Sequence, residues 1–194
     1  MKRVTTILRD VFGEPSVFGD AEDKAFWMER GTAVHKATEL YDKGTLNVCG
    51  LDYRIKPRVL SWMKFRNEVG GKIIGNETEV VNKHLGYVGH LDRMIRGSRM
   101  WPNHDLLVDI KCGKPWPICA LQLMAYKLAW LETKRTRKKI KRVAVHLSDE
   151  GYQLYPFEDD QRDAVGWYAC CNPTEINKQI IGKWALQFGT YGKV

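Results

Sequence analysis

Acidic residues and a lysine interrupt two apolar segments of this sequence, where a buried strand would normally carry aliphatic side chains. Asp109 and Lys111 lie in LLVDIKCG, and Asp92 lies in GYVGHLDRMI. Side chains two residues apart on a strand point to the same face, so Asp109 and Lys111 share one side. Each pattern alone also fits an ion pair at a sheet edge or a residue near a turn. The two patterns together favour a catalytic site.

The pairing of the two segments brings the acids together. If residues 87–95 and 105–111 form an antiparallel hairpin with its loop centred between Met100 and Trp101, Asp92 lies directly opposite Asp109. The Cβ atoms of opposed residues are ~5 Å apart. Ionised carboxylates at this separation repel, and each raises the pKa of the other. A divalent cation between them removes the repulsion, and carboxylate oxygens suit Mg²⁺ or Mn²⁺.

A hard cation beside a lysine is typical of sites that hydrolyse phosphodiester bonds. Such a cation lowers the pKa of a bound water and neutralises charge on the phosphoryl oxygens. Lys111 would orient or deprotonate that water, or stabilise the charge of the transition state. Gly89, just before Asp92, leaves room for a close approach to the strand. The sequence therefore predicts a metal-dependent nuclease.

Other polar residues have two readings each. Glu39 follows His35 by one helical turn, and it either orients a metal-bound imidazole or forms a surface pair. Gln122 and Tyr126 are four residues apart on an apolar helix. They either satisfy a helix–sheet contact or point toward the active site.

Two further segments could serve a nucleic-acid site. Either Glu77 or Glu79 could reach the metal through water, or both could be solvated. The segment 134–142, KRTRKKIKR, holds seven basic residues in nine. Such a run is usually a solvated loop, but it could also contact a DNA backbone.

The periodicity predicts a mixed α/β fold, with a central mixed β-sheet flanked by helices. A short element and a loop precede residue 21, and Gly31 could break the first long helix into two pieces. Predicted helices cover 21–42, 57–69, 117–133, 159–171 and 174–187. Predicted strands cover 77–82, 87–95, 105–111, 142–147 and 152–157.

Composition restricts the class of protein. The chain has 194 residues, of which 44% are hydrophobic, which favours a single domain over residues 1–194. We expect its core at about 21–157 and a C-terminal helical segment at about 158–194. The net charge of +8 suits a polyanionic partner, DNA before an anionic membrane surface, and it fits a merely soluble basic protein equally well. The five cysteines show no CxxC spacing, which favours reduced thiols in the cytoplasm. No apolar run is long enough to span a membrane, and none resembles a signal peptide.

Taken in order, four segments resemble the PD-(D/E)XK nuclease superfamily, in particular its RecB-type exonuclease branch and phage-encoded members. The likeness extends from about residue 4 to residue 131, and Glu77 and the opening VTTIL also fit phage members. The four segments are GTAVH (31–35), GHLD (89–92), VDIK (108–111) and QLMAY (122–126).

The resemblance implies a restriction-endonuclease-like core and a role for each matching residue. His35, Asp92, Asp109 and the Ile110 carbonyl would bind the metal. Lys111 would be the catalytic lysine. Gln122 and Tyr126 would hold the DNA, with Glu77 as an auxiliary residue.

The resemblance also implies a setting. We expect an exonuclease of DNA recombination, repair or degradation, in the bacterial host cytoplasm if phage-encoded, with room for a recombination partner protein. The alternatives are a non-catalytic nucleic-acid-binding module and a structure-selective endonuclease. Iron–sulfur members use one early and three late cysteines. Here the late pair is the adjacent Cys170 and Cys171, so we expect no cluster.

Overall fold

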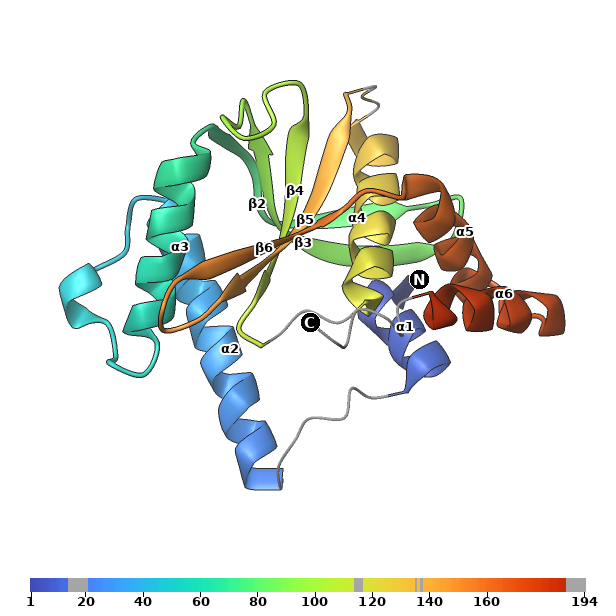
Figure 1. Cartoon of the computed structure of the whole chain (residues 1–194), viewed down its shortest axis with the longest axis horizontal. Helices are drawn as coiled ribbons and strands as arrows, with labels where there is room; N and C mark the ends of the chain where they lie inside the picture. The colour runs from blue at the N-terminus through green and yellow to red at the C-terminus, as the bar shows by residue number, and fades with distance from the viewer. Residues whose placement is uncertain (14–20, 114–116, 135, 137, 188–194) are drawn as a thin grey trace.

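The computed structural model describes residues 1–13, 21–113, 117–134, 136 and 138–187. Its centre is a six-stranded mixed sheet in the order β1-β3-β4-β5-β6, with β2 paired to the other edge of β3 (Figure 1). The β1/β3 and β4/β5 pairs are parallel, and the other pairs are antiparallel. The strands are β1 (Lys2–Arg3), β2 (Lys72–Asn82), β3 (Tyr87–Arg96), β4 (Asp105–Lys111), β5 (Ile140–Leu147) and β6 (Tyr152–Phe157).

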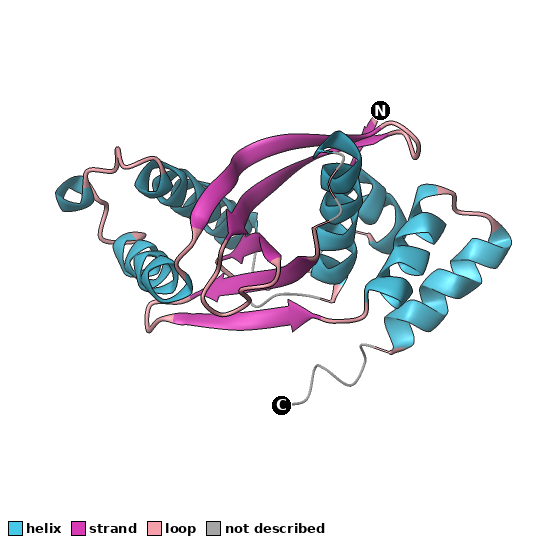
Figure 2. Cartoon of the chain, turned by 90° about the horizontal axis from the view of Figure 1, so that it is seen from above, coloured by secondary structure: helices cyan, strands magenta, loops and turns pink. Residues whose placement is uncertain are grey.

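Helices cover both faces of the sheet, as Figure 2 shows from above. The helices α2 and α3 pack on one face, and α1, α4, α5 and α6 gather on the other. This confirms the predicted mixed sheet with flanking helices. The helices are α1 (Val4–Phe12), α2 (Ala21–Asp42), the 3₁₀ helix η1 (Val48–Gly50), α3 (Lys56–Val69), α4 (Ile118–Lys134), α5 (Asp160–Cys171) and α6 (Glu175–Leu186). Within the described residues, no helix combines the length and apolar character needed to cross a membrane.

Alternation along β4 explains the two cores. Leu107 belongs to the hydrophobic cluster on the α4 side, whereas Leu106, Val108 and Ile110 belong to the cluster beneath α2 and α3. All four side chains are fully buried, and each such burial stabilises the fold by about 1.5–3 kcal/mol. Asp109 and Lys111 have the parity of Leu107, so they lie on the α4 face of the sheet.

Local signals set several boundaries. Pro57 lies in the first turn of α3, and Gly70, with φ 61°, ends it. The Asp159 side chain accepts a hydrogen bond from the Arg162 N–H at 2.9 Å, and the Thr174 hydroxyl accepts one from Asn177 N–H at 3.2 Å. These side-chain caps begin α5 and α6.

Three features differ from the predictions beyond shifts of one or two residues at element ends. α2 is continuous through Gly31, because a glycine within a helix lowers its stability without breaking its hydrogen bonds. β2 begins five residues before the predicted position. Gly75 interrupts the sequence pattern of a strand, so this part was not predicted. The register with β3 also shifts here, between Ile73 and Gly75. The prediction did not include β1, which pairs only two residues with β3.

β3 and β4 pair over residues 93–95 and 106–108 and separate beyond them. We call the opening between residues 89–92 of β3 and residues 109–111 of β4 the fork, and it positions the candidate site. β2 pairs along one edge of β3, so β1 and β4 share its other edge. β1 pairs with residues 87–88 of β3, and β4 pairs with residues 93–95. The segment Gly89–Asp92 between them has no strand partner on this edge within the described chain. The opening admits side chains from both helical layers.

Candidate functional site

Three carboxylates lie level with one another across β2, β3 and β4. The β3/β4 register pairs Arg93 with Val108, and its continuation sets Asp92 opposite Asp109, as predicted. On the other side, the pairs formed by residues 76 and 78 of β2 flank position 77, so Glu77 also lies level with Asp92. Asp92 is thus the centre of an acidic row formed by Glu77, Asp92 and Asp109.

Where β3 and β4 separate, the Asp92 side chain takes the place of a backbone hydrogen-bond acceptor. Its Oδ2 atom accepts a hydrogen bond from the Ile110 backbone N–H at 2.6 Å. Asp92 is 9% exposed and Asp109 is 2% exposed. The side chain of Asp92 therefore stays within the fork, fixed to the strand that carries Asp109.

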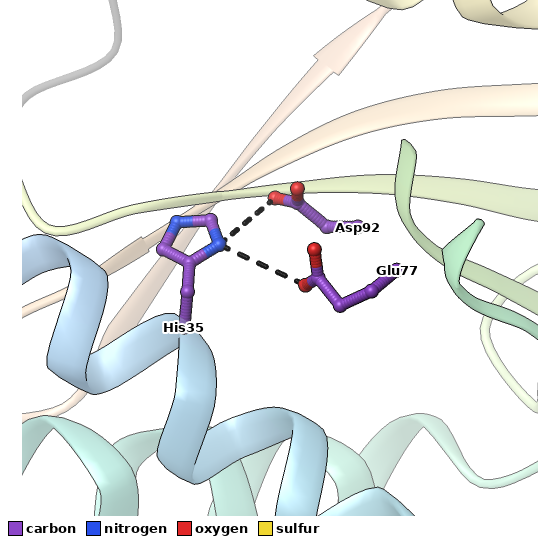
Figure 3. A group of neighbouring side chains, drawn as sticks. All are labelled: His35, Glu77 and Asp92. Carbon is purple, nitrogen blue, oxygen red and sulfur yellow. Dashed lines mark ion pairs between the residues drawn. The ribbon is translucent and has the colours of Figure 1, made fainter. Parts of the chain in front are cut away.

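His35 reaches this fork from α2. Its Nε2 atom lies 3.0 Å from the carbonyl oxygen of Ile110. Its Nδ1 atom lies 3.7 Å from Asp92 Oδ2 and 4.0 Å from Glu77 Oε1, and all three side chains converge (Figure 3). In the described part of the chain, His35, Glu77 and Asp92 form the one group of three potential metal-ligating side chains whose ligand atoms lie within 4.8 Å of each other.

The surroundings of Asp92 and Glu77 disfavour the ionised forms of both carboxyl groups. Burial raises the pKa of Asp92, and the negative charge of Asp109 raises it further. Burial also raises the pKa of Glu77, with an additional contribution from Asp92. A bound divalent cation would favour the ionised form of both groups. Carboxylate, imidazole and carbonyl donors together suit Mg²⁺ or Mn²⁺.

Asp109 lies next to this group and is paired with Lys111. The Lys111 Nζ atom lies 2.8 Å from Asp109 Oδ2 and donates to Oδ1 at 3.1 Å. Asp109 is not a member of the close group formed by His35, Glu77 and Asp92. That group offers one imidazole nitrogen and two carboxylate oxygens, which fit a metal ion.

Lys111 begins a polar chain on the α4 face. Its Nζ atom also donates to Gln122 Oε1 at 3.3 Å, and Gln122 Nε2 donates to the Tyr126 hydroxyl at 3.0 Å. Burial by itself lowers the pKa of Lys111, but the surrounding negative groups, Asp109 first among them, raise it above its ordinary value. Lys111 is therefore an ammonium group in this environment. Gln122 and Tyr126 are hydrogen-bonded to each other and, through Gln122, to Lys111, and their contact with DNA stays a prediction.

Gly89 admits the Tyr126 ring to the fork. A Cβ atom at position 89 would collide with the ring edge, including Cδ1 at 2.8 Å, and would lie 3.2 Å from Val4. The predicted need for space at this glycine is correct, but an aromatic side chain occupies that space.

A buried arginine that the sequence reasoning missed holds Glu77 in place. Arg93 is fully buried, and its guanidinium donates to Glu77 Oε1 at 2.8 Å and to Asp42 Oδ2 at 2.7 Å. It also donates to the Thr38 hydroxyl at 3.0 Å, which ties α2 to the sheet. The signal in the sequence was an arginine inside the apolar segment HLDRMI.

Glu77 also has an unusual backbone. Its φ of 44° makes it the one non-glycine residue with positive φ among the described residues. Such a conformation costs about 1–3 kcal/mol and persists where the surroundings enforce it, often at functional sites. Glu77 was predicted only as an auxiliary residue. Its Oε1 atom lies 4.0 Å from His35 Nδ1, close enough for both atoms to bind one metal ion. Glu79 lies at the surface, opposite His90.

Two other candidates lie away from the fork. Glu39 pairs with Lys36 at 2.9 Å and with Lys43, which supports the surface-pair reading. The basic segment runs from the last residue of α4 into the start of β5. There Ile140 pairs with Asp105 at the start of β4, whereas Lys111 at the end of β4 pairs with His146. Six residues of strand, about 20 Å, separate the two ends. The described part of this segment is therefore remote from Lys111.

The comparisons with known proteins agree with the fold. A scan against models of known families and a search among curated proteins found no match to this chain. Among solved structures, the chain is similar to a proposed exonuclease from Eubacterium rectale, with a TM-score of 0.50 and 11% identity. The similarity covers 97% of this chain and 81% of that chain. At this identity the likeness concerns the fold: a mixed α/β architecture shared with a nuclease-like neighbour.

Proposed function

We propose that this chain is a Mg²⁺- or Mn²⁺-dependent deoxyribonuclease. The observation that carries the proposal is the fork between β3 and β4. There Asp92 and Asp109 meet an imidazole, a backbone carbonyl and an ammonium group. The close group of ligand atoms from His35, Glu77 and Asp92, beside Asp109, is the strongest sign that a cation belongs there.

His35, Asp92, Asp109 and the Ile110 carbonyl would hold the ion, with Glu77 as a further ligand or a ligand through water. Possible ligand atoms lie beside both ring nitrogens of His35: Asp92 and Glu77 face Nδ1, and the Ile110 carbonyl oxygen lies 3.0 Å from Nε2. The ion would lower the pKa of a bound water and neutralise charge on the phosphoryl oxygens.

The chain's own residues would then act on the scissile phosphate. Hydrolysis forms a bond from a water oxygen to phosphorus and breaks the bond to the leaving ester oxygen, which takes up a proton. The Lys111 ammonium would stabilise the negative charge of the transition state, held in position by Asp109 and Gln122. Tyr126 accepts from Gln122 through its hydroxyl oxygen, so its own proton can be donated to a backbone oxygen of DNA.

An exonuclease of DNA recombination, repair or degradation is the form of this function that we favour. The resemblance of the four motifs supports it, as does the designation of the E. rectale neighbour. The net charge of +8 supports a polyanionic substrate.

The test is degradation of end-labelled linear DNA with Mg²⁺, compared with EDTA and with Lys111→Ala. The matched control is Lys183→Ala, which removes an exposed positive charge from α6. Degradation by the wild type and Lys183→Ala, but not by Lys111→Ala or with EDTA, is expected. Degradation that survives both EDTA and Lys111→Ala would contradict the proposal. Binding without degradation would favour the non-catalytic module, and cleavage of circular DNA would favour an endonuclease.

A further inference from the structure

The N-terminal turns of α2 expose aromatic side chains beyond the end of the sheet. Phe26 is 41% exposed and Trp27 is 43% exposed. β4 ends at Lys111, beside His35, and the preceding turns of α2 continue past it (Figure 1). Trp27 is seven residues before the fully buried Val34, so both lie on one face of the helix. The face that packs on the sheet at Val34 is therefore uncovered at Trp27.

The two rings pack against each other, and an arginine lies on one of them. The centroids of Phe26 and Trp27 are 5.4 Å apart with an interplanar angle of 72°. The Arg30 guanidinium lies 3.8 Å from the Trp27 ring centroid, which is cation–π geometry. Arg30 Nε is buried without a hydrogen-bond partner in the described structure. The guanidinium is thus in contact with the aromatic group.

Helix α2 connects this aromatic group to the metal site, because it carries both Trp27 and His35. Trp27 is eight residues from His35 on the same helix, about 12 Å along its axis.

Two acidic groups near Arg30 are paired with other arginines. A pocket lined by Phe26, Arg30 and the 52–55 loop also contains Glu29 and Asp52. Asp52 accepts hydrogen bonds from Arg54, and Asp149, whose charge acts on Arg30, is paired with Arg58.

We propose that Phe26, Trp27 and Arg30 bind single-stranded DNA next to the metal site. Unpaired bases would stack on the two rings, and Arg30 would contact the backbone phosphates. In a duplex, both faces of each base are covered by its neighbours, so this surface selects unpaired strands. The inference rests on the proposed nuclease function and names its substrate class.

Binding without cleavage tests the inference. Fluorescence anisotropy in EDTA compares a single-stranded oligothymidylate of about 20 nucleotides with an abasic chain and a duplex of the same length. The variants are Phe26→Ala/Trp27→Ala and Trp27→Phe. The control is Tyr168→Ala, which removes a ring that is 47% exposed on α5.

The double variant should bind the oligothymidylate about tenfold or more weakly, because each stacked base contributes about 1–3 kcal/mol. Its affinity for the abasic chain and the duplex should stay within about twofold. Trp27→Phe should retain most of the affinity, and Tyr168→Ala all of it.

An unchanged affinity of the double variant for the oligothymidylate would overturn the inference, as would an equal loss for the abasic chain. These outcomes are distinct from a failure of the proposed function. A wild-type chain that stacks bases but cleaves no DNA with Mg²⁺ would contradict the nuclease proposal alone.

Discussion

The backbone N–H of Ile110 donates a hydrogen bond to Asp92 Oδ2 at 2.6 Å, at the place where β3 and β4 separate. A side chain here takes the role that a backbone carbonyl has elsewhere in the ladder. The peptide of Ile110 is held through its N–H by Asp92, while its carbonyl lies 3.0 Å from His35 Nε2. One peptide unit thus links the acid from β3 with the imidazole from α2.

Replacing Asp92 should stabilise the metal-free protein and at the same time weaken its binding of Mg²⁺. We expect Asp92→Asn to raise the free energy of unfolding in EDTA by about 0.5–2 kcal/mol, because it removes a buried charge beside Asp109 while an amide oxygen can still accept from Ile110. The variant should lose stabilisation by Mg²⁺. For the wild type, this stabilisation is about 2.7 kcal/mol at a hundred times the Kd.

Urea unfolding with and without Mg²⁺ measures both effects. The control is Asp10→Asn, at an exposed acid that pairs with Lys2 at 3.1 Å. It should change neither quantity by more than about 0.5 kcal/mol. A Mg²⁺ effect that survives in Asp92→Asn would place the ion elsewhere.

The contact between Gly89 and Tyr126 predicts a second loss of activity. Gly89→Ala should displace the Tyr126 ring, because the added Cβ atom has no free space, and should cost about 1–3 kcal/mol of stability. DNA cleavage should fall with it, since Tyr126 connects to Lys111 through Gln122. Gly182→Ala is the matched control, as nothing lies within 4 Å of its Cβ position. Thermal unfolding and initial cleavage rates that are equal in the two variants would refute the packing argument.

The buried Arg93 should be essential for folding. Arg93→Met leaves Asp42 and Glu77 without their shared cation, and breaking a buried ion pair in this way costs about 3–5 kcal/mol. Arg66 still donates to Asp42 Oδ1 at 3.0 Å, so the larger effect falls on Glu77. The control is Lys178→Met, which breaks an exposed pair on α6 and should cost less than about 1 kcal/mol. Urea unfolding of both variants measures the difference, and similar costs would show that the Arg93 network contributes little.

The alternation of apolar residues and the position of the loop were enough to predict that Asp92 and Asp109 have opposite positions in the β3/β4 register. The apolar pattern set both strands, and the loop centre set their register, so Asp92 and Asp109 could be matched before any coordinates. The separation of β3 and β4 could not be predicted, because it depends on β1 and the Tyr126 ring, both distant in sequence.

Glu77 and Gly31 show where sequence patterns fail. The left-handed φ of Glu77 follows from contacts with Arg93 and the strand register, which no local preference indicates for glutamate. Gly31 suggested a helix break by its type alone, whereas packing of the C-terminal half of α2 on the sheet keeps the helix continuous. Tertiary contacts decided both cases.

The position of a bound metal ion tests the central claim most directly. Anomalous diffraction from a crystal grown with Mn²⁺ should show a peak in the fork, within about 2.0–2.4 Å of ligand atoms from His35, Asp92, Asp109 and the Ile110 carbonyl. A crystal with Mn²⁺ bound only at other positions would contradict the account.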